Sequence, residues 1–111
     1  MTERFEKQSR KILSSRSFNE LITFLTQQPD YGDIIPGTSG VRKLRWKTGN
    51  DNRGKSGGVR ILYHYSKGVL VLLITLYSKT NQDDITQQQK NELRSIVPAL
   101  VAAYKNEVNV S

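Results

Sequence analysis

The run VLVLLITLY, residues 69–77, is the feature that most restricts how this chain can fold. It is too short to span a bilayer, which takes about 20 residues. As a strand it would be apolar on both faces, so both faces have to be buried. Residues 59–66, VRILYHYS, form a second β-branched and aromatic segment, and Lys67-Gly68 is typical of a tight hairpin turn. We therefore predict a β-hairpin whose second strand is central in a sheet.

Two helices are predicted before this hairpin. The first rests on three apolar residues, Phe5, Ile12 and Leu13. The second has four apolar residues at i, i+3, i+4 and i+7, namely Phe18, Leu21, Ile22 and Leu25. Ser17, three residues before Glu20, fits a capping box. Residues 28–40 contain two prolines and three glycines and are predicted to be a loop, followed by a short strand at 41–47.

A third helix is predicted near the C-terminus from the stripe Leu93, Ile96, Val97, Leu100, Val101 and Tyr104. Pro98 lies inside this stripe and predicts a kink or a break just before it. Asp83, Asp84 and Thr86 are typical of a helix N-terminus. Residues 1–111 are therefore predicted to be one α+β domain. Its small antiparallel sheet of three to four strands would pack against two N-terminal helices and a C-terminal helix.

Nearly all the surplus positive charge lies in residues 41–65. This segment has seven Lys and Arg residues and one acid, Asp51, which is +6 of the chain's net +7. A pI near 9.9 indicates a polyanionic partner, such as nucleic acid, an anionic membrane or an acidic protein. Lys43, Arg45 and Lys47 would share one strand face about 7 Å apart, close to the phosphate spacing of a nucleic acid. A plain solvated face is the alternative.

The residue types exclude several kinds of site. The chain has no cysteine, hence no disulfide and no thiolate metal site. The sequence RGKSGG lacks the first glycine of a P-loop and has no helix after it. No cluster of acids lies among the basic strands to hold Mg²⁺, so we expect no cofactor. His64 is the one histidine, which excludes a two-histidine acid–base pair, and a place in the sheet is favoured over a catalytic one.

Three aromatic residues near the basic segment could stack on bases. Trp46 shares a face with Leu44, and Tyr65 shares one with Ile61, so a core position is favoured for both. For Tyr77, at a strand end, core and base stacking stay open.

The sequence IPGTSGVRKLRW, then a basic glycine-rich loop, then RILYHY and LLITLYSK, resembles the RelE/HigB group of type II toxin–antitoxin toxins, in the RelE/ParE superfamily. The resemblance covers roughly residues 5–100 and includes the final helix and the preceding DDIT. It implies a ribonuclease that enters the ribosomal A site and cuts mRNA during translation. It also implies a cognate antitoxin that covers the site, with operator DNA bound only through the antitoxin complex. Members usually begin with a strand before the first helix, whereas here almost nothing precedes Phe5.

The resemblance also implies the site residues. The arginine of the strand motif matches Arg60, and two basic residues of the preceding strand match Lys43 and Arg45. The basic residue after the last strand matches Lys79. In a metal-independent cut, the RNA 2′-OH attacks the adjacent phosphate, and Arg60 stabilises the developing charge. Lys79 or Lys43 is the expected source or acceptor of the proton, because neighbouring cations lower the pKa of a lysine.

Further RNA contacts are expected from five residues: Lys47, Arg53, Lys55, His64 and Tyr77. Some members place a second arginine or an aromatic residue beyond the last strand, but here that stretch is TNQDD.

Two other functions stay open at this stage, a ParE-like gyrase poison and a non-catalytic basic module that binds RNA or DNA. The N-terminal segment MTERFEKQSRKIL has two acids and no apolar core, so we expect no signal peptide, no membrane partner and a cytoplasmic location.

Overall fold

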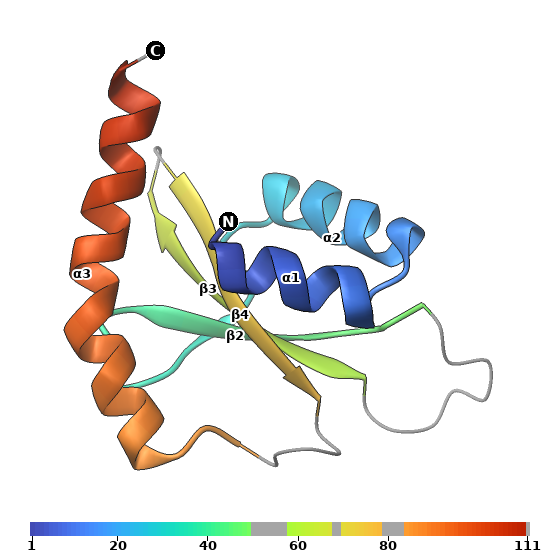
Figure 1. The fold of residues 1–111 in the computed structure, drawn as a ribbon, viewed down its shortest axis with the longest axis horizontal. Helices are drawn as coiled ribbons and strands as arrows, with labels where there is room; N and C mark the ends of the chain where they lie inside the picture. The colour runs from blue at the N-terminus through green and yellow to red at the C-terminus, as the bar shows by residue number, and fades with distance from the viewer. Residues whose placement is uncertain (50–57, 68–69, 79–83, 111) are drawn as a thin grey trace.

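A computed structural model describes residues 1–49, 58–67, 70–78 and 84–110, without the side chains of residues 70 and 107–110. Its elements follow in the order α1 (Glu3–Ile12), α2 (Ser15–Gln27), β1 (Asp33–Ile34), β2 (Val41–Trp46), β3 (Val59–Ser66), β4 (Leu70–Ser78) and α3 (Gln87–Val110). The four strands form one antiparallel sheet in the order β1-β2-β3-β4. Figure 1 labels β2, β3 and β4 of this sheet. The predicted α+β fold is confirmed. One detail was wrong, because β1 lies within the segment predicted to be a loop.

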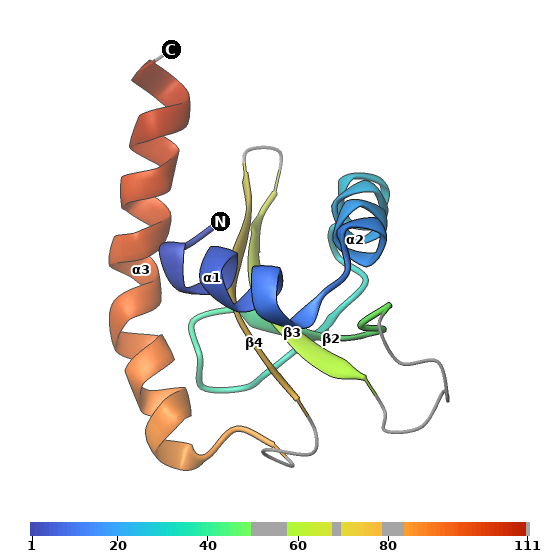
Figure 2. The ribbon, with the colours of Figure 1, turned by 45° about the vertical axis from the view of Figure 1, so that its right-hand side comes forward.

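Helices cover both faces of the sheet. On one face α1 and α2 pack residues such as Phe5 and Leu21 against Leu44 and Ile61 of the sheet. On the other face α3 packs a second cluster, made of Ile35, Val41, Leu62, Leu72, Ile74, Ile85, Leu93, Val97 and Val101. Figure 2 shows α3 and α2 on opposite sides of the β3–β4 hairpin. In the part of the chain that the structure describes, no helix combines the length and the apolar character that a membrane span requires.

The prediction that the second hairpin strand is central in the sheet was wrong. β4 lies at the edge of the sheet and pairs only with β3 among the described strands. Its side chains are apolar on both faces because helices cover both. Leu73 and Leu76 belong to the α1–α2 cluster, whereas Leu72 and Ile74 belong to the α3 cluster. The apolar residues on both faces of β4 are therefore explained by two helical layers that cover the sheet, and they do not indicate a second neighbouring strand.

The free edge of β4 is closed by the N-terminal segment. The Thr2 amide donates to the Leu73 carbonyl at 2.9 Å, and the Thr2 hydroxyl donates to the Ile74 carbonyl. Further along, the Leu76 amide donates to Oε1 of Gln8 in α1 at 3.0 Å. No strand precedes α1 among the described residues. Thr2 and Gln8 instead satisfy part of an edge that would otherwise be open to pairing with another chain.

Side-chain caps fix where the helices begin. The predicted capping box at Ser17 was wrong, because α2 begins at Ser15 and its N-cap is Ser14, whose hydroxyl accepts from the Ser17 amide. At α3 the prediction holds for Thr86. Its hydroxyl accepts from the Gln89 amide at 3.1 Å, and the Gln89 side chain accepts from the Thr86 amide at 2.8 Å, which is a reciprocal capping box.

Of the kink or break predicted at Pro98, the break does not occur, because α3 runs from residue 87 to residue 110 with Pro98 inside it. A proline has no amide hydrogen, so the carbonyl four residues earlier, that of Arg94, loses its helical donor. Ser39 replaces that donor: its hydroxyl donates to the Arg94 carbonyl at 3.0 Å. Buried Leu93, Val97 and Val101 hold the helix on the sheet around the proline. A tertiary hydrogen bond and packing thus offset the cost of Pro98.

This arrangement predicts an energetic coupling between Ser39 and Pro98. Ser39→Ala should cost about 1 kcal/mol more in the wild-type background than in a Pro98→Ala background, where the restored amide of residue 98 can bond the Arg94 carbonyl. The double-mutant cycle cancels the separate cost of placing alanine at φ 61°, the conformation of Ser39. Urea unfolding of the four proteins measures the coupling, and equal losses in both backgrounds would show that Ser39 does not replace the missing donor.

Candidate nucleic-acid interface

Strand register brings the basic residues together on the sheet face that α3 covers in part. Arg45 of β2 lies directly opposite Arg60 of β3, and Arg60 lies opposite Tyr77 of β4. The neighbouring row on the same face contains Lys43 and Leu62. The predicted alternation on these strands is therefore confirmed. Arg45, Arg60 and Tyr77 form the first row, and Lys43 belongs to the second. We call these four side chains together the cationic row.

Two arginines face each other at the centre of the cationic row. Arg45 is exposed, and no ion pair involves it in the described part of the chain. Arg60 is only 8% exposed. Directly opposed residues on antiparallel strands have Cβ atoms about 5 Å apart, so the two side chains start from neighbouring positions on one face of the sheet. An anion within reach of both guanidinium groups could accept bidentate hydrogen bonds from them.

An acid that sequence analysis explained only as a helix cap belongs to the same surface. Asp84 Oδ1 lies 3.4 Å from Nζ of Lys43 and 3.5 Å from the Tyr77 hydroxyl. The Ile85 amide donates to the same oxygen at 2.8 Å, and this bond, followed by the positive charge of Lys43, lowers the pKa of Asp84. Because Ile85 is buried in the α3 cluster, the carboxylate is anchored close to the cationic row.

Tyr77 is half-buried and packs against the α3 cluster, whereas its predicted stacking on a base stays a prediction. Burial raises the pKa of Tyr77, and the negative charge of Asp84 acts in the same direction, whereas the positive charge of Arg60 opposes it. The hydroxyl therefore stays protonated near neutral pH. At the end of β4, the neutral Tyr77 hydroxyl can therefore donate a hydrogen bond beside the charged groups of Asp84 and Arg60.

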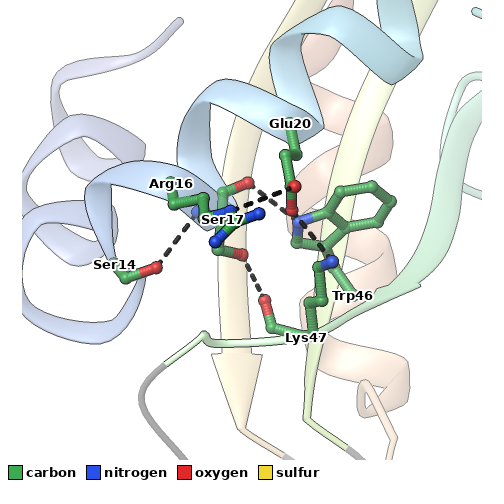
Figure 3. A network of polar contacts seen from close by, with 6 residues as sticks. All are labelled: Ser14, Arg16, Ser17, Glu20, Trp46 and Lys47. Carbon is green, nitrogen blue, oxygen red and sulfur yellow. Dashed lines mark hydrogen bonds and ion pairs between the residues drawn. The ribbon is translucent and has the colours of Figure 1, made fainter.

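Lys47 does not join the cationic row, and its predicted place on the same face was wrong. Strand β2 ends at Trp46, and Lys47 Nζ forms a 2.9 Å ion pair with Glu20 of α2, on the other side of the sheet. Figure 3 shows this network, in which the Ser17 hydroxyl also donates to the Lys47 carbonyl. The Trp46 indole donates to the Ser17 carbonyl at 3.1 Å, and the partly buried Trp46 packs against the α1–α2 cluster, on the core side predicted for it.

Arg42 is also a structural residue rather than part of the cationic row. Its guanidinium donates to the carbonyls of Asp30 and Gly32 at 3.0 and 2.8 Å and so holds the loop that precedes β1. Two of the basic residues counted in the sequence therefore serve the fold. Charge counting cannot separate these from the others, because the distinction depends on which way each side chain turns.

His64 lies on the α3 side of the sheet but several residues away from Arg60, beside Gly40 and opposite Val41. Its Nδ1 is buried, with no hydrogen-bond partner among the described residues. Burial lowers the pKa of His64, and the positive charges of Lys105 in α3 and Arg42 in β2 lower it further. The structure gives it a place in the sheet, as predicted, and does not bring it to the cationic row.

Three predicted site residues, Lys79, Arg53 and Lys55, lie outside the described residues. Within the described ranges, no group of three or more His, Cys, Asp or Glu side chains could hold a metal ion. A search against models of known protein families finds none that matches this chain.

The signal that could have revealed Asp84 is its position just before a buried isoleucine, at the entry to a helix that must pack over the basic strands. Sequence alone does not show how far an acid at that entry lies from Lys43, because the distance depends on how α3 docks.

The environment of His64 predicts a pH dependence of stability. A folded-state pKa below the usual 6.5 means that the unfolded chain binds the proton more readily. The contribution of neutral His64 to the free energy of unfolding is complete above about pH 6.5. This contribution is lost as the pH falls through the folded-state pKa of His64. Because His64 is the one histidine, His64→Gln should flatten the change in unfolding free energy between about pH 7 and pH 5. An unchanged slope in urea unfolding across that range would contradict this assignment.

Proposed function

We propose that this chain is a RelE/HigB-like toxin, a ribosome-dependent endoribonuclease that cuts mRNA without a metal ion, inhibits translation and is neutralised by a cognate antitoxin. The observation that carries the proposal is the direct cross-strand pairing of Arg45 with Arg60, flanked by Lys43 and Tyr77. Two guanidinium groups on neighbouring strands can bind one phosphate through bidentate hydrogen bonds. The fold and the resemblance of the strand sequences support the same function.

The proposed chemistry is attack of the RNA 2′-oxygen on the adjacent phosphorus, with breakage of the bond from phosphorus to the 5′-oxygen. The proton of the 2′-hydroxyl leaves to a base, and the 5′-oxygen takes up a proton. Arg60 and Arg45 stabilise the negative charge that develops on the phosphoryl oxygens. Lys43, 3.4 Å from the carboxylate of Asp84, is the candidate for proton transfer among the described residues.

The burial of Arg60 favours a second candidate function, a basic module that binds nucleic acid without cutting it. Arg60 is 8% exposed, so a phosphate can reach its guanidinium only over a small area unless neighbouring side chains move. In such a module Arg60 would support the sheet, and Arg45 and Lys43 would supply sequence-independent phosphate contacts. Binding would then persist where cutting does not occur.

The first test compares Arg60→Lys with wild type on a message translated in a cell-free system. Lysine keeps the charge but loses the planar fork of donors, so cutting should slow by at least about 10²-fold. Lys47→Gln is the matched control, because Lys47 pairs with Glu20 away from the cationic row, and it should cut like wild type. Primer extension maps the cuts, and thermal unfolding checks that both variants are folded.

Each negative result has a distinct meaning. A message left intact by wild-type protein in the presence of ribosomes would reject the nuclease. Normal cutting by Arg60→Lys would reject the role of Arg60 in stabilising charge, but it would leave the nuclease proposal standing.

Asp84 provides a second prediction. Asp84→Asn retains an oxygen that can accept from the Ile85 amide but removes the charge facing Lys43. Loss of that orientation should lower kcat by roughly tenfold to 10²-fold. RNA affinity should stay equal or rise, because one negative charge near the phosphates is gone. Single-turnover cutting and filter binding separate the two effects, and a loss of affinity at unchanged kcat would contradict an orienting role.

A further inference from the structure

A groove next to the cationic row has no role in the chemistry above. It has a volume of about 370 Å³ and lies between α1 and α3, along the end of β4. Apolar side chains that include Leu62, Ile85 and Leu93 form part of its wall. Polar side chains from both helices line the rest. Binding sites for small ligands combine these features, with apolar walls for contact and a few polar groups for orientation.

The groove is continuous with the cationic row. Tyr77 lines it, and Tyr77 is the strand partner of Arg60. Leu62 also lines it, and Leu62 is the strand partner of Lys43. Ile85, in the wall, directly follows Asp84, whose carboxylate faces Lys43. An RNA strand whose phosphate lies at Arg60 would therefore have a neighbouring base within reach of the groove.

The two helices present complementary groups at the groove. Arg4 of α1 and Glu92 of α3 both line it, and no ion pair joins them, although both belong to the described residues. Ile96 of α3, in the same wall, is 48% exposed, which makes it one of the few large apolar side chains of the described chain that face solvent. The groove thus offers the exposed side chain of Ile96 beside a core wall, together with a cation and an acid for which the described residues show no ion pair.

Guanine fits this combination best. Its flat faces suit apolar contact with Ile96 and stacking at Tyr77. Its N1–H and N2–H donors match the two oxygens of one carboxylate, and its O6 and N7 acceptors match one guanidinium. Adenine has no pair of donors on its Watson–Crick edge, and cytosine is smaller. We propose that the groove between α1 and α3 is a subsite for a guanine base, read by Glu92 and Arg4. As a subsite for substrate RNA it rests on the proposed function, but its affinity for the base can be measured without any cutting.

The test is an amide NMR titration of the full chain with guanosine, adenosine and cytidine 5′-monophosphates. The three share a phosphate, so a difference between them isolates the base. GMP should bind at least about tenfold tighter than AMP, the discrimination of one good bidentate contact, and should shift the amides of Glu92 and Ile96. Glu92→Gln should reduce the preference to about threefold or less, because an amide offers only one acceptor oxygen. Glu3→Gln, the same change at an exposed acid of α1 outside the groove, should leave it unaltered.

Equal affinity for the three nucleotides would overturn the proposal, and so would a guanine preference that survives Glu92→Gln. A preference that persists in a protein that cuts no message would support the guanine site and reject only the nuclease. Cutting of message without any guanine preference would reject the subsite and leave the nuclease standing.

Discussion

The β3–β4 hairpin is buried on both faces, and the rest of the fold follows from that burial. A fully buried aliphatic side chain contributes about 1.5–3 kcal/mol, and this hairpin presents such side chains to two separate clusters. One helical layer cannot cover both faces, so α1 and α2 pack on one side and α3 on the other (Figure 2). β4 lies at the edge of the sheet, where Thr2 and Gln8 supply hydrogen-bond partners for part of its backbone.

The same burial determines where charge can collect. On the α3 face, the apolar cluster includes Leu62, and the next alternate residue along β3 is Arg60. Pairing with β2 places Arg45 beside it, and the chain entering α3 brings Asp84 to Lys43. Arginine and lysine are thus concentrated at the border of an apolar core, where the local dielectric strengthens their interaction with an anion. The groove that we assign to guanine lies along the same border, between α1 and the start of α3.

Much of this arrangement could be predicted from periodicity. Alternation correctly separated Leu44 and Trp46 from Lys43 and Arg45, because a strand has only two faces. Other predictions failed where a single side chain changes direction or finds a distant partner. Lys47 lies one residue beyond the end of β2 and turns to Glu20. Pro98 stays inside α3 because Ser39, far away in sequence, donates to the carbonyl that the proline leaves without a partner.

The sequence by itself determined the fold class, the two-sided burial of the hairpin and the segment that holds the surplus charge. These properties depend on the spacing of apolar and charged residues along the chain, which can be read from the sequence directly. Only the tertiary structure decided that β4 is an edge strand, that Arg42 and Lys47 serve the fold, and that Asp84, Arg4 and Glu92 border the sites. Those outcomes depend on how helices dock on the sheet, which is set by packing between residues that are distant in sequence.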